Sequence, residues 1–259
     1  MLNSINVMWF VPQPLLVRAG QAPGAIAIQA SRNPSSDAQF ASLVAGDVDV
    51  VVTAMDNVIG WNRRPGPKDF RVVAQVERTT PLALVAAHGK KNMDDLRGAN
   101  ILVDAVNNGY VMALRAMMRE AGIDENSYCL TPAGGVTERY EALLAGRGDA
   151  TLLGQPFMSQ ATEAGLMQIA SVQQVYPAFP GQGIVMRQAS PARERVGVWL
   201  RDLERARQQV QDPDSLRPTA AGVALLIEHR RLLGLAGGED SYAEIVDASL
   251  LDIFLEQNL

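Results

Sequence analysis

The chain has 259 residues, of which 47% are hydrophobic and 20% charged, and its formal net charge is −5. This composition is ordinary for a soluble globular protein with one large or two small domains. The negative charge argues against a nucleic-acid surface, and no apolar run approaches the roughly 20 residues of a membrane span. The single cysteine, Cys129, excludes an internal disulfide.

The first part of the chain alternates strands with helices. The helix after the second strand begins at an N-cap, Ser35 or Ser36, and Pro14 is well placed to open the first helix. A β-α-β-α-β order is typical of an α/β unit with a mostly parallel sheet. We expect strands at 5–10, 25–30, 48–53 and 70–76, and helices at 14–20, 36–45 and 55–61.

A polar stretch that ends in a proline, residues 77–81, interrupts the strands and helices, and a second α/β unit follows. A further break comes at 177–182, after which one return strand precedes a helical tail. For the second unit we expect strands at 82–87, 99–103, 127–132, 150–153 and 166–170, and helices at 110–121, 136–145 and 156–164. For the rest we expect a strand at 183–187 and helices at 191–211, 219–233 and 242–255.

These breaks predict two lobes. Lobe 1 comprises 1–78 and 180–259 with the C-terminal helices, lobe 2 comprises 82–176, and the crossovers at 77–81 and 177–182 form a hinge. Lobe 2 is then an insertion within lobe 1. We expect each lobe to be a mostly parallel sheet flanked by helices, with a ligand cleft at the hinge.

The chain also repeats itself at a distance of one hundred residues. The stretch 40–49 and the stretch 140–149 each read as an aromatic residue, a helical turn, a glycine and an aspartate, followed by a short apolar run. Gly46 and Gly146 suit the left-handed position that ends a helix. We expect Asp49 and Asp149 to make structural bonds at the turn between helix and strand.

Several stretches together resemble a known fold. They lie at 43–49, 80–85, 93–103, 117–124 and 140–157, and they are similar to the type II periplasmic-binding-protein-like fold. Within that fold the chain resembles the NMT1/THI5-like and the nitrate/sulfonate/taurine substrate-binding proteins of ABC importers. The resemblance implies a two-lobed protein that closes over a small molecule.

The chain departs from that resemblance in three places. It shows no secretion signal. At the start of the first helix of lobe 2, the family often has residues rich in glycine, serine and threonine, whereas residues 104–110 of this chain are not. The THI5-type pyrimidine synthases have a cysteine-rich iron motif, which a chain with only Cys129 cannot carry. We therefore expect no metal site and no cofactor.

Ligands of open α/β sheets bind beyond the carboxyl ends of the strands, so the residues there are the candidates for ligand binding. The candidates share this position or lie at a crossover. They are Trp9, Phe10, Gln13, Thr53, Met55, Asp56, Asn57, Arg78, Asn107, Asn108, Gly109, Tyr110, Gln155, Phe157 and Phe179.

The residue types of these candidates favour an organic anion or an aromatic acid. Backbone N–H groups at 107–109 begin a helix and can bind an anion, unless they serve only as its cap. Arg78 can grip a carboxylate with two hydrogen bonds, or pair with a neighbouring acid. Trp9, Phe10 and other aromatic residues can sandwich a flat ligand, although any one of them can instead be core.

Two functions remain open at this point. The first is a small-molecule binding protein similar to ABC-importer components, with a permease as its partner if a leader has been removed. The second is a cytoplasmic, metal-independent enzyme of the lyase, decarboxylase or isomerase type. In the enzyme Asp56 would be the general base; in the binding protein it can bind a ligand ammonium or cap the helix at 55–61. We expect a cytoplasmic protein as written, periplasmic if a leader was trimmed, and a monomer or weak dimer.

Overall fold

The computed structural model describes residues 4–22, 25–107, 109–210 and 214–255. The chain divides into two units, each with its own sheet. The first unit is made of Met1–Arg78, Pro180–Ala224 and Asp240–Leu259, and the second of Thr79–Phe179 and Leu225–Glu239.

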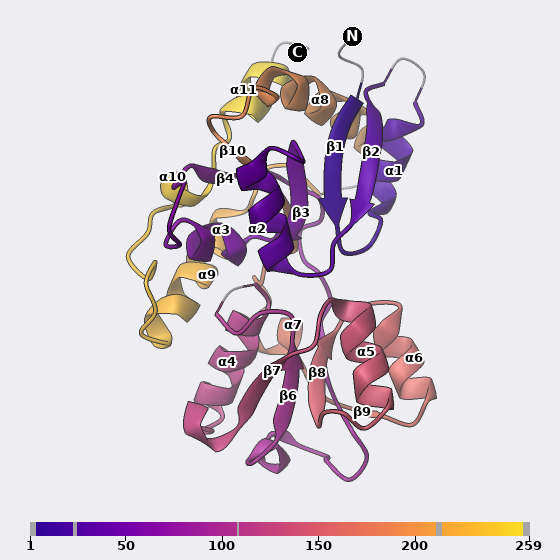
Figure 1. The fold of residues 1–259 in the computed structure, drawn as a ribbon, viewed down its shortest axis with the longest axis vertical. Helices are drawn as coiled ribbons and strands as arrows, with labels where there is room; N and C mark the ends of the chain where they lie inside the picture. The colour runs from indigo at the N-terminus through magenta and orange to yellow at the C-terminus, as the bar shows by residue number, and fades with distance from the viewer. Residues whose placement is uncertain (1–3, 23–24, 108, 211–213, 256–259) are drawn as a thin grey trace. The chain divides into compact units, whose positions relative to one another are not determined.

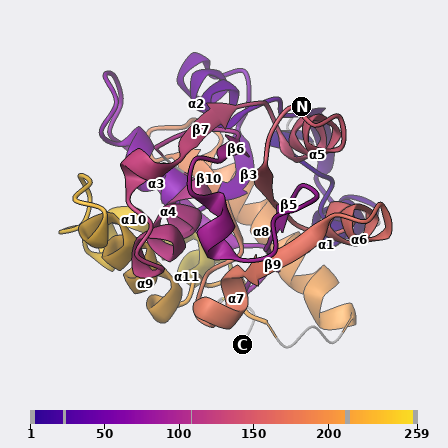
Figure 2. The ribbon, with the colours of Figure 1, turned by 90° about the horizontal axis from the view of Figure 1, so that it is seen from below.

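The first unit contains a five-stranded sheet. Its strands are β1 (Ser4–Trp9), β2 (Ala27–Arg32), β3 (Val50–Ala54), β4 (Phe70–Gln75) and β10 (Gln182–Arg187), in the spatial order β2-β1-β3-β10-β4 (Figure 1). β1 pairs in parallel with β2 and β3. β10 pairs antiparallel with β4 and with β3, beside which it is labelled in Figure 2. The return strand β10 is thus the one that opposes the others, and the mostly parallel sheet is confirmed.

Helices of the first unit begin and end where the sequence offers the right caps. Pro14 opens the first helix, and the Ser35 hydroxyl accepts a hydrogen bond from the Ala38 N–H at 3.2 Å at the start of the second. Gly46 ends that helix with a φ of 78°, as predicted. The helices are α1 (Pro14–Gly20), α2 (Ser36–Ala45), α3 (Asp56–Trp61), α8 (Arg193–Gln209), α10 (Tyr242–Ile245) and α11 (Ser249–Leu255).

The core of the first unit has two parts. One is apolar and joins the sheet to α1, α8 and α11, with Trp199 of α8 fully buried within it. The other is a cluster of three aromatic rings from α2, α3 and β4. The ring of Phe40 lies 6.1 Å from that of Trp61 and 5.3 Å from that of Phe70. Both parts bury the apolar strands that sequence periodicity predicted.

The second unit repeats the plan of the first. Its strands are β5 (Ala83–Ala86), β6 (Asn100–Val103), β7 (Cys129–Pro132), β8 (Ala150–Leu153) and β9 (Met167–Ser171), in the spatial order β7-β6-β8-β5-β9. β6 pairs in parallel with β7 and β8, and β5 pairs antiparallel with β8 and β9. Its helices are α4 (Val111–Glu120), α5 (Val136–Leu144), α6 (Phe157–Glu163) and α7 (Val172–Val175), with 3-10 turns η1 (Met93–Leu96) and η2 (Glu125–Ser127).

The repeat seen in the sequence is a repeat of structure. Asp49 precedes β3 and accepts a hydrogen bond from the Asn6 N–H at 2.8 Å, while its own N–H donates to the Asn6 carbonyl. Asp149 precedes β8 and makes the same two bonds with Asn100. The predicted structural role of both aspartates is confirmed, since each ties the turn after a helix to the neighbouring strand.

The helix α9 (Ala220–Leu232) belongs to both units. Residues Leu225–Glu239 group with the second unit, whereas the predicted division gave all of 180–259 to lobe 1. Hydrogen bonds and aromatic packing join this segment to the second unit, since Arg230 donates to the Asn107 carbonyl and Arg119 donates to the Leu232 carbonyl. The His229 ring lies 4.4 Å from the Tyr176 ring and 6.1 Å from the Phe179 ring.

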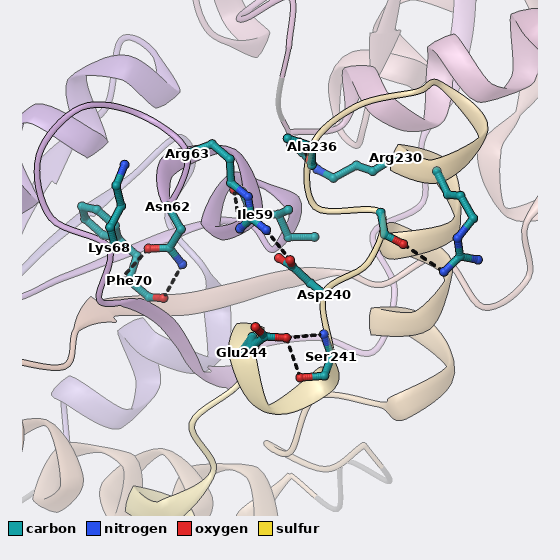
Figure 3. Close-up of polar contacts among 12 residues, drawn as sticks. Ile59, Asn62, Arg63, Lys68, Phe70, Arg230, Ala236, Asp240, Ser241 and Glu244 are labelled. Carbon is teal, nitrogen blue, oxygen red and sulfur yellow. Dashed lines mark hydrogen bonds and ion pairs between the residues drawn. The ribbon is translucent and has the colours of Figure 1, made fainter.

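Polar side chains hold the connection between α3 and β4 (Figure 3). Asn62 donates to the Phe70 carbonyl and accepts from the Phe70 N–H, each at 3.1 Å. Arg63, the next residue, pairs with Asp240 (Figure 3). These bonds fix the loop at 62–68 against the C-terminal part of the first unit.

The C-terminal tail is broken where one helix was predicted at 242–255. Ser241 and Glu244 form a capping box at the start of α10 (Figure 3). Val246 then bridges to Val72 of β4, so the chain becomes extended before α11 begins. This pairing joins distant parts of the chain and overrides the local helical pattern.

Candidate functional site

Each sheet has a topological switch point, where successive strands are added on opposite sides of the first. In the first unit it lies between β1 and β3, and the Gln39 amide of α2 occupies it. Gln39 Nε2 donates to the Val52 carbonyl at 3.0 Å and to the Met8 carbonyl at 3.4 Å. Gln39 is fully buried, and its Oε1 has no partner among the described residues. Switch points are where ligands bind in open α/β sheets.

In the second unit the switch point lies between β6 and β8, and the Arg139 guanidinium of α5 occupies it. Arg139 Nη1 donates to the Leu152 carbonyl at 2.6 Å and to Thr151 Oγ1 at 2.9 Å. The Thr151 hydroxyl in turn donates a hydrogen bond to the Leu102 carbonyl of β6 at 2.8 Å. Arg139 Nε is buried and has no partner within the described ranges.

The electrostatic surroundings of Arg139 differ from those of Arg115, a buried arginine of the same unit. Burial lowers the pKa of the Arg139 guanidinium, while the Asp104 and Glu138 carboxylates act in the opposite direction. No ion pair of the described residues involves Arg139. Arg115, by contrast, pairs with Glu125 at 2.8 Å. The second switch point therefore holds a cation without a carboxylate at contact distance.

Most predicted ligand residues after β3 are buried in the first unit. Thr53, Met55, Asp56 and Asn57 are each at most 1% exposed. Asn57 Nδ2 donates to Thr53 Oγ1 at 2.6 Å, so the Thr53 hydroxyl is engaged by the protein. Asp56 lies in the first turn of α3, where a carboxylate is favourable to the helix. The structure thus gives this group a supporting position at the end of β3.

The remaining candidates of the first unit are more varied. Trp9 ends β1 and is part of the core, whereas Phe10 and Gln13 are partly exposed. The Arg78 side chain is exposed, and its backbone N–H donates to Asp214 at 3.2 Å. Phe10 and Gln13 therefore remain accessible beyond the carboxyl end of β1.

The loop between β6 and α4 is fixed by two arginines. Arg115 Nη1 donates to the Val106 carbonyl at 3.2 Å and to Asn107 Oδ1 at 3.4 Å. Arg230 of α9 donates to the Asn107 carbonyl at 3.4 Å. Gly109 has a φ of 75°, which suits a glycine. Asn108 lies outside the described residues.

Each aromatic candidate of the second unit packs against another aromatic ring. The Tyr110 ring lies 5.8 Å from that of Phe179, which is 1% exposed, and Tyr110 and Thr80 share a hydroxyl hydrogen bond of 3.0 Å. The Phe157 ring lies 5.2 Å from that of Tyr140. Gln155 is exposed beyond β8 and accepts from the Ser159 hydroxyl. Tyr110 and Phe157 remain partly exposed, whereas Phe179 is core.

The sequence analysis did not select Gln39 or Arg139, although the repeat contained the signal. Each residue immediately precedes the aromatic residue that opens one copy, and they lie one hundred positions apart. Their carbonyl partners, Val52 and Leu152, are also one hundred positions apart. Extending the repeat by one residue toward the N-terminus would have included both residues at equivalent positions.

The described residues contain no group of three or more His, Cys, Asp or Glu side chains placed to hold a metal ion. In the same part of the chain, no helix has the length and apolar character needed to cross a membrane.

Solved structures of ABC-importer ligand-binding components share the two-unit α/β architecture of this chain. No protein-family model matches the sequence, and no curated protein matches it either. Solved structures match it over nearly the whole chain. One is a protein of Bordetella bronchiseptica RB50, with a TM-score of 0.79 at 13% identity over 99% of this chain and 98% of the other.

Two further matches have stated ligands. The ligand-binding component of an ABC-type import system from Staphylococcus aureus, with zinc bound, has a TM-score of 0.76 at 11% identity over 97% of this chain and 99% of the other. The periplasmic sulfonate-binding protein SsuA of Methylobacillus flagellatus KT has a TM-score of 0.63 at 13% identity over 99% and 95%. At such identities the similarity shows the fold, and the predicted fold is confirmed.

Proposed function

We propose that this protein binds a small organic acid, as the substrate-binding component of an ABC-type importer does. The observation that carries the proposal is the match of the whole chain, both units included, to proteins whose stated role is ligand binding. A sulfonate is the ligand named for one of these neighbours. A sulfonate is an organic anion, which is the class of ligand that the sequence predicts.

The proposed ligand residues divide by accessibility. Phe10 and Gln13 in the first unit, with Tyr110, Gln155 and Phe157 in the second, are at least partly exposed and are the proposed contacts. The group of Thr53, Met55, Asp56 and Asn57 is buried at the end of β3, where Asn57 donates to the Thr53 hydroxyl. Asn107 positions its loop through its hydrogen bonds with arginines, and the loop N–H groups remain proposed donors to an anion.

The enzymatic alternative is not favoured, because the structural neighbours are binding components. Asp56 in particular is 1% exposed and lies within the first turn of α3. A general base must come within hydrogen-bond reach of the proton that it removes. Nothing in the position of Asp56 provides that reach.

An importer permease is the partner that this proposal implies, and the periplasm is the compartment named for the sulfonate-binding neighbour. Cell fractionation of the native gene product tests the location. Recovery from the periplasm supports the importer role, and recovery from the cytoplasm supports a sensor or enzyme. The monomer or weak dimer expected from the sequence stays a prediction, which sedimentation can test.

The first experiment is native mass spectrometry of protein purified without added ligand, followed by a thermal-shift screen of metabolites. A ligand that binds only the folded state raises the melting temperature by mass action. We expect a compound that is released with unchanged mass. A compound that leaves with a different mass would overturn the proposal in favour of catalysis. A protein that retains and responds to no compound would overturn it as well.

A further inference from the structure

The Arg139 side chain of the second unit has an incomplete set of partners. Both hydrogen bonds of its guanidinium start from Nη1, and Nε is buried without a partner among the described residues. Nε and Nη2 of an arginine point the same way and form the fork that binds a carboxylate with two parallel hydrogen bonds. This fork is the part of the side chain that the protein leaves unused.

The charge on Arg139 is also incompletely compensated. Burying a cation costs free energy unless a counter-charge and hydrogen bonds compensate it. The Asp104 and Glu138 carboxylates oppose the lowering of the Arg139 pKa by burial, yet no ion pair joins either of them to Arg139 in the described part of the chain. A bound anion would supply the missing partner.

The internal repeat shows which features are particular to the second unit. In the first unit Ser35 caps the helix with its hydroxyl, and Gln39 at the switch point is neutral. At the equivalent positions the second unit has Gly135, which gives α5 no side-chain cap, and Arg139. Both replacements, which lie four residues apart, favour an anion: one leaves the helix N-terminus uncapped and the other adds a positive charge.

We propose that Arg139 is an anion receptor at the second switch point, where its Nε and Nη2 bind the carboxylate of an organic acid. This inference rests on the proposed function and names the residue and the ligand group that it takes. The start of α5 also favours an anion, because Gly135 provides no side-chain acceptor for the first backbone N–H groups of the helix.

The test uses the full-length protein and four named acids: acetate, benzoate, succinate and taurine. Each is titrated by thermal shift and calorimetry against the parent and three variants. Arg139→Gln removes the charge but installs the side chain that the first unit has at this position. Arg139→Lys keeps the charge without the fork. Arg147→Gln is the matched control, because Arg147 is exposed and lies just beyond the same helix.

We expect at least one of the carboxylic acids to stabilise the parent. Arg139→Gln should weaken its binding by about 30-fold or more, and Arg139→Lys by about tenfold, because charge-assisted bidentate bonds are among the strongest hydrogen bonds. Arg147→Gln should bind as the parent does. The melting temperature of ligand-free Arg139→Gln should stay close to that of the parent, because glutamine can bond Leu152 as Gln39 bonds Val52.

Binding by Arg139→Gln within twofold of the parent would place the anion elsewhere and overturn the inference, while the proposed function would stand. Failure of all four acids would also overturn it. If a neutral metabolite is nevertheless retained in native mass spectrometry, small-molecule binding stands without Arg139. If nothing at all is retained, the proposed function itself fails.

Discussion

The Asp149 carboxylate accepts a hydrogen bond of 2.7 Å from the backbone N–H of Asn100, which begins the neighbouring strand. Asp49 makes the equivalent bond of 2.8 Å with Asn6 in the other unit. The two turns differ in their cations. Arg195 donates to Asp49 at 2.8 Å, whereas Lys90 lies 3.7 Å from Asp149.

Replacing either aspartate by alanine should therefore destabilise the protein, and Asp49→Ala should cost more than Asp149→Ala. Loss of the acceptor leaves a strand N–H unpaired, at about 1–3 kcal/mol. Asp49→Ala additionally leaves a partly buried arginine without its counter-charge. Urea denaturation of both variants measures the difference. Equal losses would show that the Arg195 pair contributes nothing measurable.

His229 predicts a pH dependence of stability. Burial lowers the pKa of this histidine to about 4 in the folded protein, below its ordinary value of 6.5. The folded state therefore binds fewer protons than the unfolded state between these values, so stability falls as the pH drops from about 6.5 to about 4. The loss should reach on the order of 3 kcal/mol.

Thermal melts from pH 7 to pH 4 check this dependence. His229→Phe keeps an aromatic ring against Tyr176 and should flatten the curve over this range. His88→Gln serves as the control, because His88 is exposed and is the only other histidine of the chain. A curve that His229→Phe leaves unchanged would assign the effect to carboxylates instead.

Arg115 should control the order of the loop at 105–109. Its guanidinium holds Val106 and Asn107 and pairs with Glu125. Arg115→Met should destabilise the protein by about 1–3 kcal/mol, because it leaves the Val106 carbonyl and Asn107 Oδ1 without their donor, while the partly exposed Glu125 can turn to water. Hydrogen exchange should increase in the loop.

Arg119→Met on the same helix is the matched control for Arg115. Arg119 lies 4.0 Å from Glu125 with a side chain 42% exposed, so its ion pair should contribute less than about 1 kcal/mol. Equal effects of the two substitutions would show that the loop does not depend on Arg115.

Gly197 of α8 marks a close approach to α11. A Cβ at this position would lie 2.2 Å from a ring carbon of Phe254. Gly197→Ala should therefore cost about 1–3 kcal/mol through overpacking, despite the better helix propensity of alanine. The substitution Phe254→Leu should recover part of this loss in the double variant, and a double-mutant cycle measures the coupling. Additive effects would contradict the close approach.

The sequence predicted the features of the fold that are local or periodic. Gly46 and Gly146 have positive φ, and the apolar runs after them are buried strands. The break between α10 and α11 was missed, because it depends on the pairing of Val246 with Val72, far away in the chain. Local propensity carries no information about such a contact.

The candidate site was harder to predict than the fold. Thr53 lies inside β3 near its carboxyl end, and Phe157 follows β8 at the start of α6. Exposure separates the buried candidates from the accessible ones, and it follows from packing that the sequence does not show. Arg139 is one of several helix arginines in the sequence, and its hydrogen bond to the Leu152 carbonyl is a long-range contact that the sequence does not show. The predicted ligand-binding role of every candidate stays a prediction.

The shared helix α9 has a consequence for how the chain can be divided. The covalent path changes unit after Arg78, Phe179, Ala224 and Glu239, so neither unit can be excised with two cuts. A fragment of Thr79–Phe179 alone would lack His229 and leave the Tyr176 ring without its neighbour. During synthesis, the second unit therefore acquires its full set of contacts only after residues 225–239 have left the ribosome.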